Sequence, residues 1–271
     1  MKSQPLQMAK NSILVFACMS SISFVKAQKT DSTSEAKAKL PIQKFYNQDA
    51  VIRNKFPYRS FVLPAFMIAY GFTTLKSSGL EKVNEKVKEE MTENPHKKIP
   101  IDNFLLIAPA AAVYGLNIAG IKGKNNFRDR SIIYLMSNVF TNATVFGLKN
   151  LMHQQRPDGS DYASFPSGHT AEAFASAEFL RQEYKGVSPW YGVAGYVAAS
   201  ATGLLRMYNN KHWLSDVVTG AGIGIASTKL AYWIYPVIKR KFFKEKPMNA
   251  FVMPYYQSGS AGLSMVYNFH N

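Results

Sequence analysis

The chain has almost no cysteine. Among its 271 residues the one cysteine is Cys18, which lies inside an N-terminal stretch with the features of an export signal. Without that stretch the chain has no cysteine, so no disulfide can form in it. Cys18 follows Val15-Phe16-Ala17, a weak imitation of a lipoprotein cleavage box. The bulky Phe16 makes lipidation the weaker alternative.

Acidic residues are also few. The chain has 17 Asp and Glu against 32 Lys and Arg, which gives a formal net charge of +15. Such a balance suits an anionic substrate or an anionic membrane surface. It does not favour nucleic acid as a partner, because the lysines are scattered and no nucleic-acid-binding motif accompanies them.

Long hydrophobic runs without polar residues are missing as well. The mean hydropathy is −0.13, which is low for a protein with six membrane spans. Six apolar segments are nevertheless present, at Phe56–Leu75, Ile101–Ile121, Ser131–Leu148, His169–Tyr184, Trp190–Met207 and Trp213–Ile238. Several approach the roughly 20 residues of a span. Buried helices of a soluble all-α domain have a similar pattern, so hydropathy leaves both possibilities open.

The pattern predicts an all-α fold, a bundle of about six apolar helices with the functional site at one end. Between the first two segments, Lys76–Lys98 interleaves Lys and Glu and predicts a solvated helix. Near the C-terminus, Leu263, Met265 and Tyr267 alternate with polar residues, which is a strand period. With Ala250–Tyr256 as the partner strand, they predict a short β-hairpin.

The predicted organisation has four parts. Residues 1–27 are a signal peptide, with a basic start, an apolar stretch Ile13–Val25 and the cleavage site Val25-Lys26-Ala27. Residues 28–55 are a polar leader, 56–246 the helical domain and 247–271 the hairpin tail. An uncleaved anchor is the alternative for the first part, although its apolar stretch is short for a span.

Three short segments carry the chemistry. They are Lys149-x6-Arg156-Pro157, then Pro166-Ser167-Gly168-His169, then Arg206-x5-His212-x3-Asp216. Lys and Arg bind an oxyanion, and a helix that begins at a Ser-Gly turn adds backbone N–H groups. One histidine can attack phosphorus while the other protonates the leaving oxygen. The set therefore indicates a site that holds a phosphate and cleaves it from its ester, with no metal required.

These residues, in this order and spacing, resemble the type 2 phosphatidic acid phosphatases. Their superfamily also includes bacterial class A acid phosphatases and vanadium haloperoxidases. Ten fixed residues make chance agreement negligible. One departure is Leu205, which stands where the family has Ser before Arg206. If that hydroxyl helps to hold the phosphate, we expect weaker substrate binding here.

The resemblance implies a role for each site residue. His212 is the nucleophile, oriented by Asp216, and forms a phosphohistidine, while His169 is the general acid. The phosphate is held by the remaining residues of the pattern, which are Lys149, Arg156, Ser167, Gly168 and Arg206. His153, Asp158 and Asp161 are interpreted as loop residues. No metal and no cofactor are implied.

The function predicted in this way is metal-independent hydrolysis of a phosphate ester or pyrophosphate, and we expect the substrate to be a lipid. Phosphatidate, a polyprenyl pyrophosphate and lipid A are the candidate partners. We expect an exported, inner-membrane-associated protein whose site faces the periplasm. A soluble periplasmic acid phosphatase is the alternative, and vanadate-dependent halide oxidation or a catalytically dead scaffold are weaker ones. The sequence does not indicate an oligomeric state.

Overall fold

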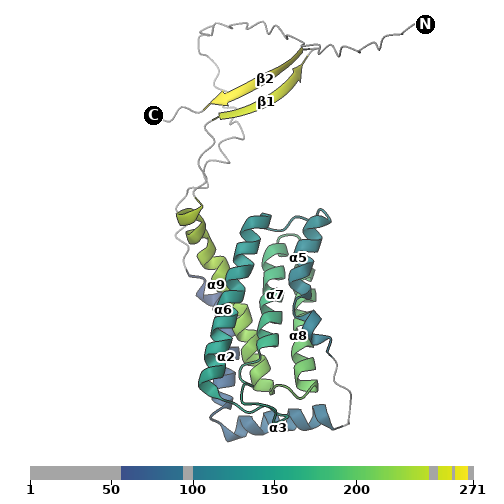
Figure 1. Cartoon of the computed structure of the whole chain (residues 1–271), viewed down its shortest axis with the longest axis vertical. Coiled ribbons are helices and arrows are strands. Elements are labelled where there is room, and N and C mark those ends of the chain that lie inside the picture. The colour runs from purple at the N-terminus through teal and green to yellow at the C-terminus, as the bar shows by residue number, and fades with distance from the viewer. Residues whose placement is uncertain (1–55, 94–99, 244–249, 258–259, 268–271) are drawn as a thin grey trace, which may run out of the picture. The chain divides into compact units, whose positions relative to one another are not determined.

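The computed structural model describes residues 56–93, 100–243, 250–257 and 260–267. Within these residues there are eight helices and two strands, and the all-α prediction is confirmed for the helical part (Figure 1). The helices are α2 (Tyr58–Thr74), α3 (Ser78–Thr92), α4 (Asp102–Leu105), α5 (Ala108–Ile118), α6 (Phe127–Met152), α7 (Gly168–Tyr184), α8 (Pro189–Tyr208) and α9 (Leu214–Phe242). The predicted signal peptide and leader lie outside the described residues.

The helix count differs from the sequence prediction at one place. The expected single segment Ile101–Ile121 is two helices, a four-residue α4 and an eleven-residue α5. Pro109 stands in the first turn of α5. Because proline has no N–H and disfavours helical geometry in the residue before it, the chain breaks between the two helices.

Helix α7 is the centre of the bundle, packed against α5, α6, α8 and α9. Its alanines Ala171, Ala173, Ala175 and Ala177 are fully buried. Small side chains let neighbouring helices approach closely on several sides at once. These alanines are therefore suited to a helix that four others contact.

Helix α9 touches its neighbours through glycines. A Cβ built at Gly220 would lie 2.5 Å from the Ser167 carbonyl oxygen, and one at Gly224 would lie 2.1 Å from that of Ala171. Gly222, on another face, meets the backbone of α2 at Pro64. This small-residue spacing is typical of tightly packed membrane helices. It fixes the start of α9 against the start of α7.

Two acidic residues of α7 are buried and fully paired. Glu178 accepts two hydrogen bonds from Arg181, at 2.7 and 2.6 Å. Glu183 accepts hydrogen bonds from Asn125 and from the Tyr232 hydroxyl, each at 2.6 Å. Buried carboxylates are tolerated when such partners compensate for lost hydration. These pairs explain how a helix with several charges can occupy the middle of the bundle.

The antiparallel order of the helices brings two junctions to one end. The α6–α7 and α8–α9 junctions lie together, and α3 crosses the bundle at this end (Figure 1). Asn84 of α3 accepts from the Ser215 N–H at 3.1 Å and donates to the Ser215 hydroxyl at 2.9 Å. The predicted solvated helix is thus attached to the first turn of α9. All three sequence motifs fall at this end.

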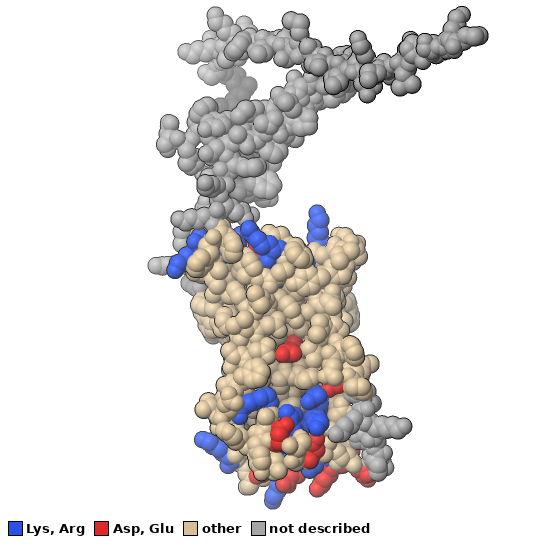
Figure 2. Space-filling view, in the orientation of Figure 1, with Lys and Arg blue, Asp and Glu red and all other residues tan. Residues whose placement is uncertain are grey.

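The surface between the two ends of the helical part is apolar. Figure 2 shows Lys, Arg, Asp and Glu gathered at the two ends, with a nearly uncharged belt between them apart from one acidic patch. Large exposed apolar side chains contribute to it, among them Leu63, Phe66, Leu135, Val139, Phe146, Val193 and Val197. By length and composition, α6 and α9 could each cross a membrane.

The two strands lie near the C-terminus. β1 (Ala250–Gln257) and β2 (Ser260–Tyr267) pair antiparallel, with Ala250 opposite Tyr267 and Gln257 opposite Ser260. This register leaves the two intervening residues to connect the strands.

Candidate active site

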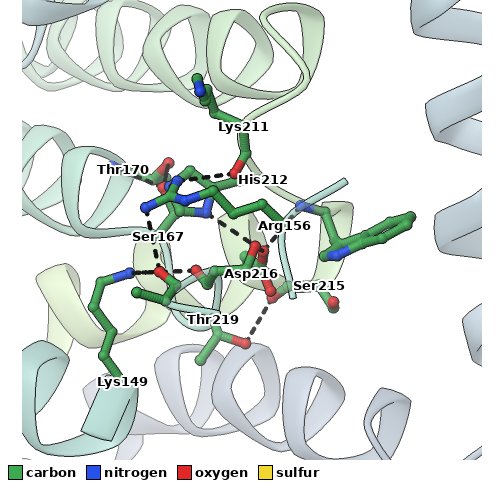
Figure 3. A network of polar contacts seen from close by, with 12 residues as sticks. Lys149, Arg156, Ser167, Thr170, Lys211, His212, Ser215, Asp216 and Thr219 are labelled. Atoms are coloured by element: carbon green, nitrogen blue, oxygen red, sulfur yellow. Dashed lines mark hydrogen bonds and ion pairs between the residues drawn. The ribbon is translucent and has the colours of Figure 1, made fainter. Parts of the chain in front are cut away.

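His212 and Asp216 form the centre of the candidate site (Figure 3). Nδ1 of His212 lies 3.4 Å from Oδ2 of Asp216, and both side chains are almost completely buried, with 2% and 0% exposed. Four residues separate the pair, which is the spacing of side chains on one face of a helix. In the structure α9 begins at Leu214, so His212 lies in the turn before it. The contact spans the N-terminus of α9.

The partners of His212 determine which ring nitrogen carries the proton. Nη1 of Arg156 lies 3.2 Å from Nε2 of His212. A guanidinium can only donate, so Nε2 accepts and the proton is on Nδ1, facing Asp216. Nε2 therefore presents a lone pair toward the arginine. Burial lowers the pKa of His212 to about 4, against the opposing effect of Asp216.

Arg156 is held by a network of oxygen atoms. Its Nε donates to Oδ1 of Asp161 at 2.7 Å, and its Nη1 donates to the Lys211 carbonyl at 3.0 Å. Asp161 also accepts from the Ala163 N–H at 2.8 Å, and this bond and Arg156 lower the pKa of its carboxyl group. Asp158 accepts from Lys211 Nζ at 2.6 Å. Both aspartates thus shape the loop, as the sequence suggested.

Lys149 reaches the same place from the last turn of α6 (Figure 3). Its Nζ donates to the carbonyl groups of Ala163 and Ser164. The Ser164 hydroxyl in turn donates to Oδ2 of Asp216 at 2.5 Å. The Trp213 N–H donates to the same oxygen at 2.9 Å. Two donors besides His212 therefore hold the carboxylate of Asp216.

Ser167 is the N-cap of α7. Its hydroxyl accepts from the Thr170 N–H at 3.4 Å, as expected for this position. Its own N–H donates to the Asp216 carbonyl at 3.1 Å, which ties the starts of α7 and α9 together. A Cβ at Gly168 would meet only Val145, at an ordinary 3.6 Å. Protein packing alone therefore does not require glycine at this helix mouth.

Arg206 enters the site from the last turn of α8. Its Nη1 donates to Oδ2 of Asp102 at 2.8 Å, and the Asp102 side chain is 2% exposed. Nε of Arg206 is buried and has no hydrogen-bond partner within the described part of the chain. An unpaired buried guanidinium N–H is costly. It is a donor suited to an anionic ligand.

His169 is the second residue of α7 and is half-buried. Its Nε2 lies 2.9 Å from Oδ1 of Asn103. The charges that act on its ring are those of Arg206, Asp102, Arg156 and Lys149. Arg206 and Arg156 also act on His212. The two histidines therefore share one set of cations, so the structure brings all eight predicted site residues to one region.

Residues 130–240 match the family model described as the PAP2 superfamily. This stretch contains every residue of the three motifs. Residues 130–240 form a PAP2 domain. The domain spans α6 to α9, the helices that surround and build the site. The resemblance drawn from the motifs is thereby confirmed for these residues.

A curated relative of the PAP2 domain is a lipid A 1-phosphatase of Porphyromonas gingivalis. It is 41% identical over 144 residues, which are 52% of this chain and 32% of that protein. The chain thus matches about a third of the relative's length.

Two solved structures are similar to this chain at lower identity. One is Aquifex aeolicus LpxE, with a TM-score of 0.42, 21% identity and coverage of 55% of this chain and 94% of that one. The other is a transmembrane PAP2 type phosphatidylglycerolphosphate phosphatase from Bacillus subtilis. Its TM-score is 0.46 at 19% identity, and the match covers 70% of this chain and 100% of that one.

The structure adds residues that the motifs did not indicate. Asp102 and Asn103 precede the PAP2 domain in the chain, yet they contact Arg206 and His169. Their one sequence signal is a pair of polar residues at the start of an apolar segment. Ser164, two residues before Pro166, was also missed. His153 caps α6 in a left-handed conformation and is exposed, and Leu205 is half-buried in α8.

Proposed function

We propose that this protein is a phosphatase that hydrolyses a lipid phosphate ester or pyrophosphate through a phosphohistidine on His212. The observation that carries the proposal is the buried His212–Asp216 pair beside Arg156, with the unpaired Nε of Arg206 in the same site. A phosphate that accepts from Arg156 takes the place of Nε2 as the acceptor of that guanidinium, which leaves the Nε2 lone pair beside phosphorus. Holding phosphorus beside the attacking nitrogen in this way removes much of the entropic cost of the reaction.

The reaction then has two steps. In the first, Nε2 of His212 forms a bond to phosphorus as the bond to the leaving oxygen breaks, and His169 gives its proton to that oxygen. In the second, water attacks phosphorus, the P–N bond breaks, and His169 takes the proton from the water. Lys149, Arg156 and Arg206 stabilise the charge that develops on the other oxygens.

A lipid is the substrate class that the surface supports. A groove of about 640 Å³ runs along α8, lined mainly by apolar side chains such as Val193, Val197 and Leu204. Leu204 lies near the C-terminal end of α8, so the groove reaches the same end of the bundle as Arg206 and the site. A chain of CH₂ groups in such a groove gains roughly 0.8 kcal/mol per buried group. The P. gingivalis relative, named for action on lipid A, agrees with this class.

The charge distribution supports a site that faces the periplasm. At the site end, cations are matched by carboxylates, including Asp102, Asp158 and Asp161 and the glutamates of α3. The opposite end carries a basic excess from Lys122, Lys124, Arg128, Lys185, Lys239, Arg240 and Lys241, of which Arg128 and Lys239 are paired with Asp129. An anionic cytoplasmic leaflet attracts such a surface. The apolar belt with α6 and α9 then lies in the inner membrane.

The test uses the full chain purified in detergent. We expect phosphate release from at least one of phosphatidate, a polyprenyl pyrophosphate and lipid A, undiminished by excess EDTA and inhibited by vanadate, a transition-state mimic. His212→Ala is the matched inactive control. Activity confined to small soluble esters would favour a general acid phosphatase. If EDTA abolished phosphate release and added Mg²⁺ restored it, the proposed metal-independent mechanism would be wrong.

A further inference from the structure

Helix α4 adds two adjacent residues to the site from outside the PAP2 domain. Asp102 accepts from Arg206, 104 residues further along the chain, and Asn103 contacts His169, 66 residues further along. The Asp102 contact holds a phosphate-binding guanidinium. The Asn103 contact concerns the ring that the proposed reaction uses as its acid.

The Asn103 contact determines which ring nitrogen of His169 keeps its hydrogen and which one gives its proton to the substrate. With Oδ1 of Asn103 as the acceptor, Nε2 of His169 carries a hydrogen and donates it over 2.9 Å. In the protonated ring the second hydrogen is on Nδ1. When that hydrogen leaves, the ring becomes neutral without losing its bond to Asn103. The leaving oxygen therefore receives its proton from Nδ1, and the ring stays in place.

The two histidines differ in the charge of the group behind them. His212 has a carboxylate at its Nδ1, which stabilises positive charge on the ring as the nucleophile forms its bond. His169 has a neutral amide at its Nε2. An amide orients the ring but does not stabilise the imidazolium as a full negative charge does. The ring consequently gives up its proton more readily than it would beside a carboxylate.

We propose that Asn103 is a positioning residue that orients the general acid His169 and keeps it a stronger acid than a carboxylate partner would. The proposal rests on the proposed phosphatase function. The other charges facing His169 come from α8, α4, the α6–α7 loop and α6, as Arg206, Asp102, Arg156 and Lys149. Asp102 is paired with Arg206, so position 103 is where a new charge would act on His169.

The experiment compares Asn103→Asp, Asn103→Ala and the wild type on an alkyl phosphate and on p-nitrophenyl phosphate. Asn103→Asp should move the basic limb of the pH profile for the alkyl ester to higher pH by about one unit or more, and lower its plateau kcat. Asn103→Ala should lower kcat for the alkyl ester about 10- to 100-fold, part of the usual contribution of a general acid. With p-nitrophenyl phosphate, whose leaving group needs little protonation, both variants should stay within about threefold of the wild type.

The control for added charge is Asn150→Asp, an exposed residue next to Lys149 on α6. This variant should leave unchanged both the basic limb of the pH profile and the difference in rate between the two esters. Equal losses on the two esters, or an unmoved basic limb in Asn103→Asp, would overturn the role of Asn103. Phosphate release that persists in His212→Ala would instead overturn the phosphohistidine function. Asn103 is exposed, so these variants should fold, and vanadate binding checks that they do.

Discussion

At the scale of single residues, chemical roles follow from what stands next to each side chain. Arg156 contacts Nε2 of His212, while Asp216 contacts Nδ1. The ring is therefore fixed between a cation and an anion, with its lone pair on the side where a phosphate would bind. His169 has no such carboxylate, and its partner is Asn103.

This difference predicts how activity depends on the leaving group. His169→Ala should be nearly inactive on an alkyl phosphate but recover about 10²–10⁴-fold on p-nitrophenyl phosphate, because that leaving group needs little protonation. His212→Ala should recover nothing, since no substrate supplies the attacking nitrogen. Asp216→Asn should fall between them. Steady-state rates of the three variants on both esters measure this. If His212→Ala, and not His169→Ala, regained activity on p-nitrophenyl phosphate, then His169 would be the nucleophile and His212 the general acid.

The pKa of His212 gives a second prediction at this scale. Burial lowers it from 6.5 to about 4, so the ring should remain neutral and able to attack well below neutral pH. The folded state disfavours the protonated ring, and its contribution to stability, full above pH 6.5, is lost as the pH falls toward 4. NMR titration of the histidine rings, with His212 assigned by His212→Gln, measures the midpoint. A midpoint near 6.5 would contradict the buried geometry.

At the scale of helices, the site depends on how closely α7 and α9 approach. Ser167 caps α7 and donates its N–H to the Asp216 carbonyl in the first turn of α9. Gly220 lies against the Ser167 carbonyl and Gly224 against that of Ala171. The two helix starts are thus held at a backbone-to-backbone distance that only glycine allows.

Gly220→Ala should therefore damage both stability and activity. The new Cβ would lie 2.5 Å from a backbone oxygen, so α9 must move away from α7, at a cost of roughly 1–3 kcal/mol for overpacking. The shift also separates Ser167 from Asp216. Thermal unfolding in detergent and phosphate release measure the two effects.

Gly147→Ala is the matched control for that change. Gly147 is also a helical glycine, on α6, and a Cβ there meets nothing within 4 Å. Alanine favours a helix over glycine by about 1 kcal/mol, so this variant should be as stable as the wild type or slightly more. If both alanine variants behave alike, close packing at Gly220 is not what holds the helices.

At the scale of the whole molecule, the distribution of charge distinguishes the two ends of the bundle. The site end carries cations paired with carboxylates, and the opposite end has a basic excess (Figure 2). Basic residues flank the apolar segments on both sides in the sequence, so a count along the chain does not show this difference. Only pairing in space shows which cations are balanced.

Labelling of intact cells tests the proposed orientation. With Cys18 replaced by Ser, single cysteines at Glu89 of α3 and at Lys122 mark the two ends, and both positions are exposed. A membrane-impermeant maleimide should label Glu89→Cys in intact cells, and Lys122→Cys only after permeabilisation. The reverse pattern would place the site in the cytoplasm. Release of the protein by osmotic shock would support the soluble alternative.

The sequence by itself determined the resemblance to a family, the identity of the motif residues and the start of a helix at the Ser167-Gly168 turn. These depend on residue type and short spacing, which act locally along the chain. It also placed both motif-bearing junctions on the same end, since an even number of helix reversals separates them. His212–Asp216 could be paired because four residues separate them, although the helix boundary between them was not evident.

The tertiary structure alone decided which residues complete the site. Asp102 and Asn103 reach Arg206 and His169 only because the chain breaks before α5 and α4 packs against α8. No local pattern encodes contacts across 104 and 66 residues. The balance of charge at each end of the bundle could not be predicted from the sequence for the same reason. Pairing between distant side chains depends on how the helices pack, and packing is a property of the folded chain as a whole.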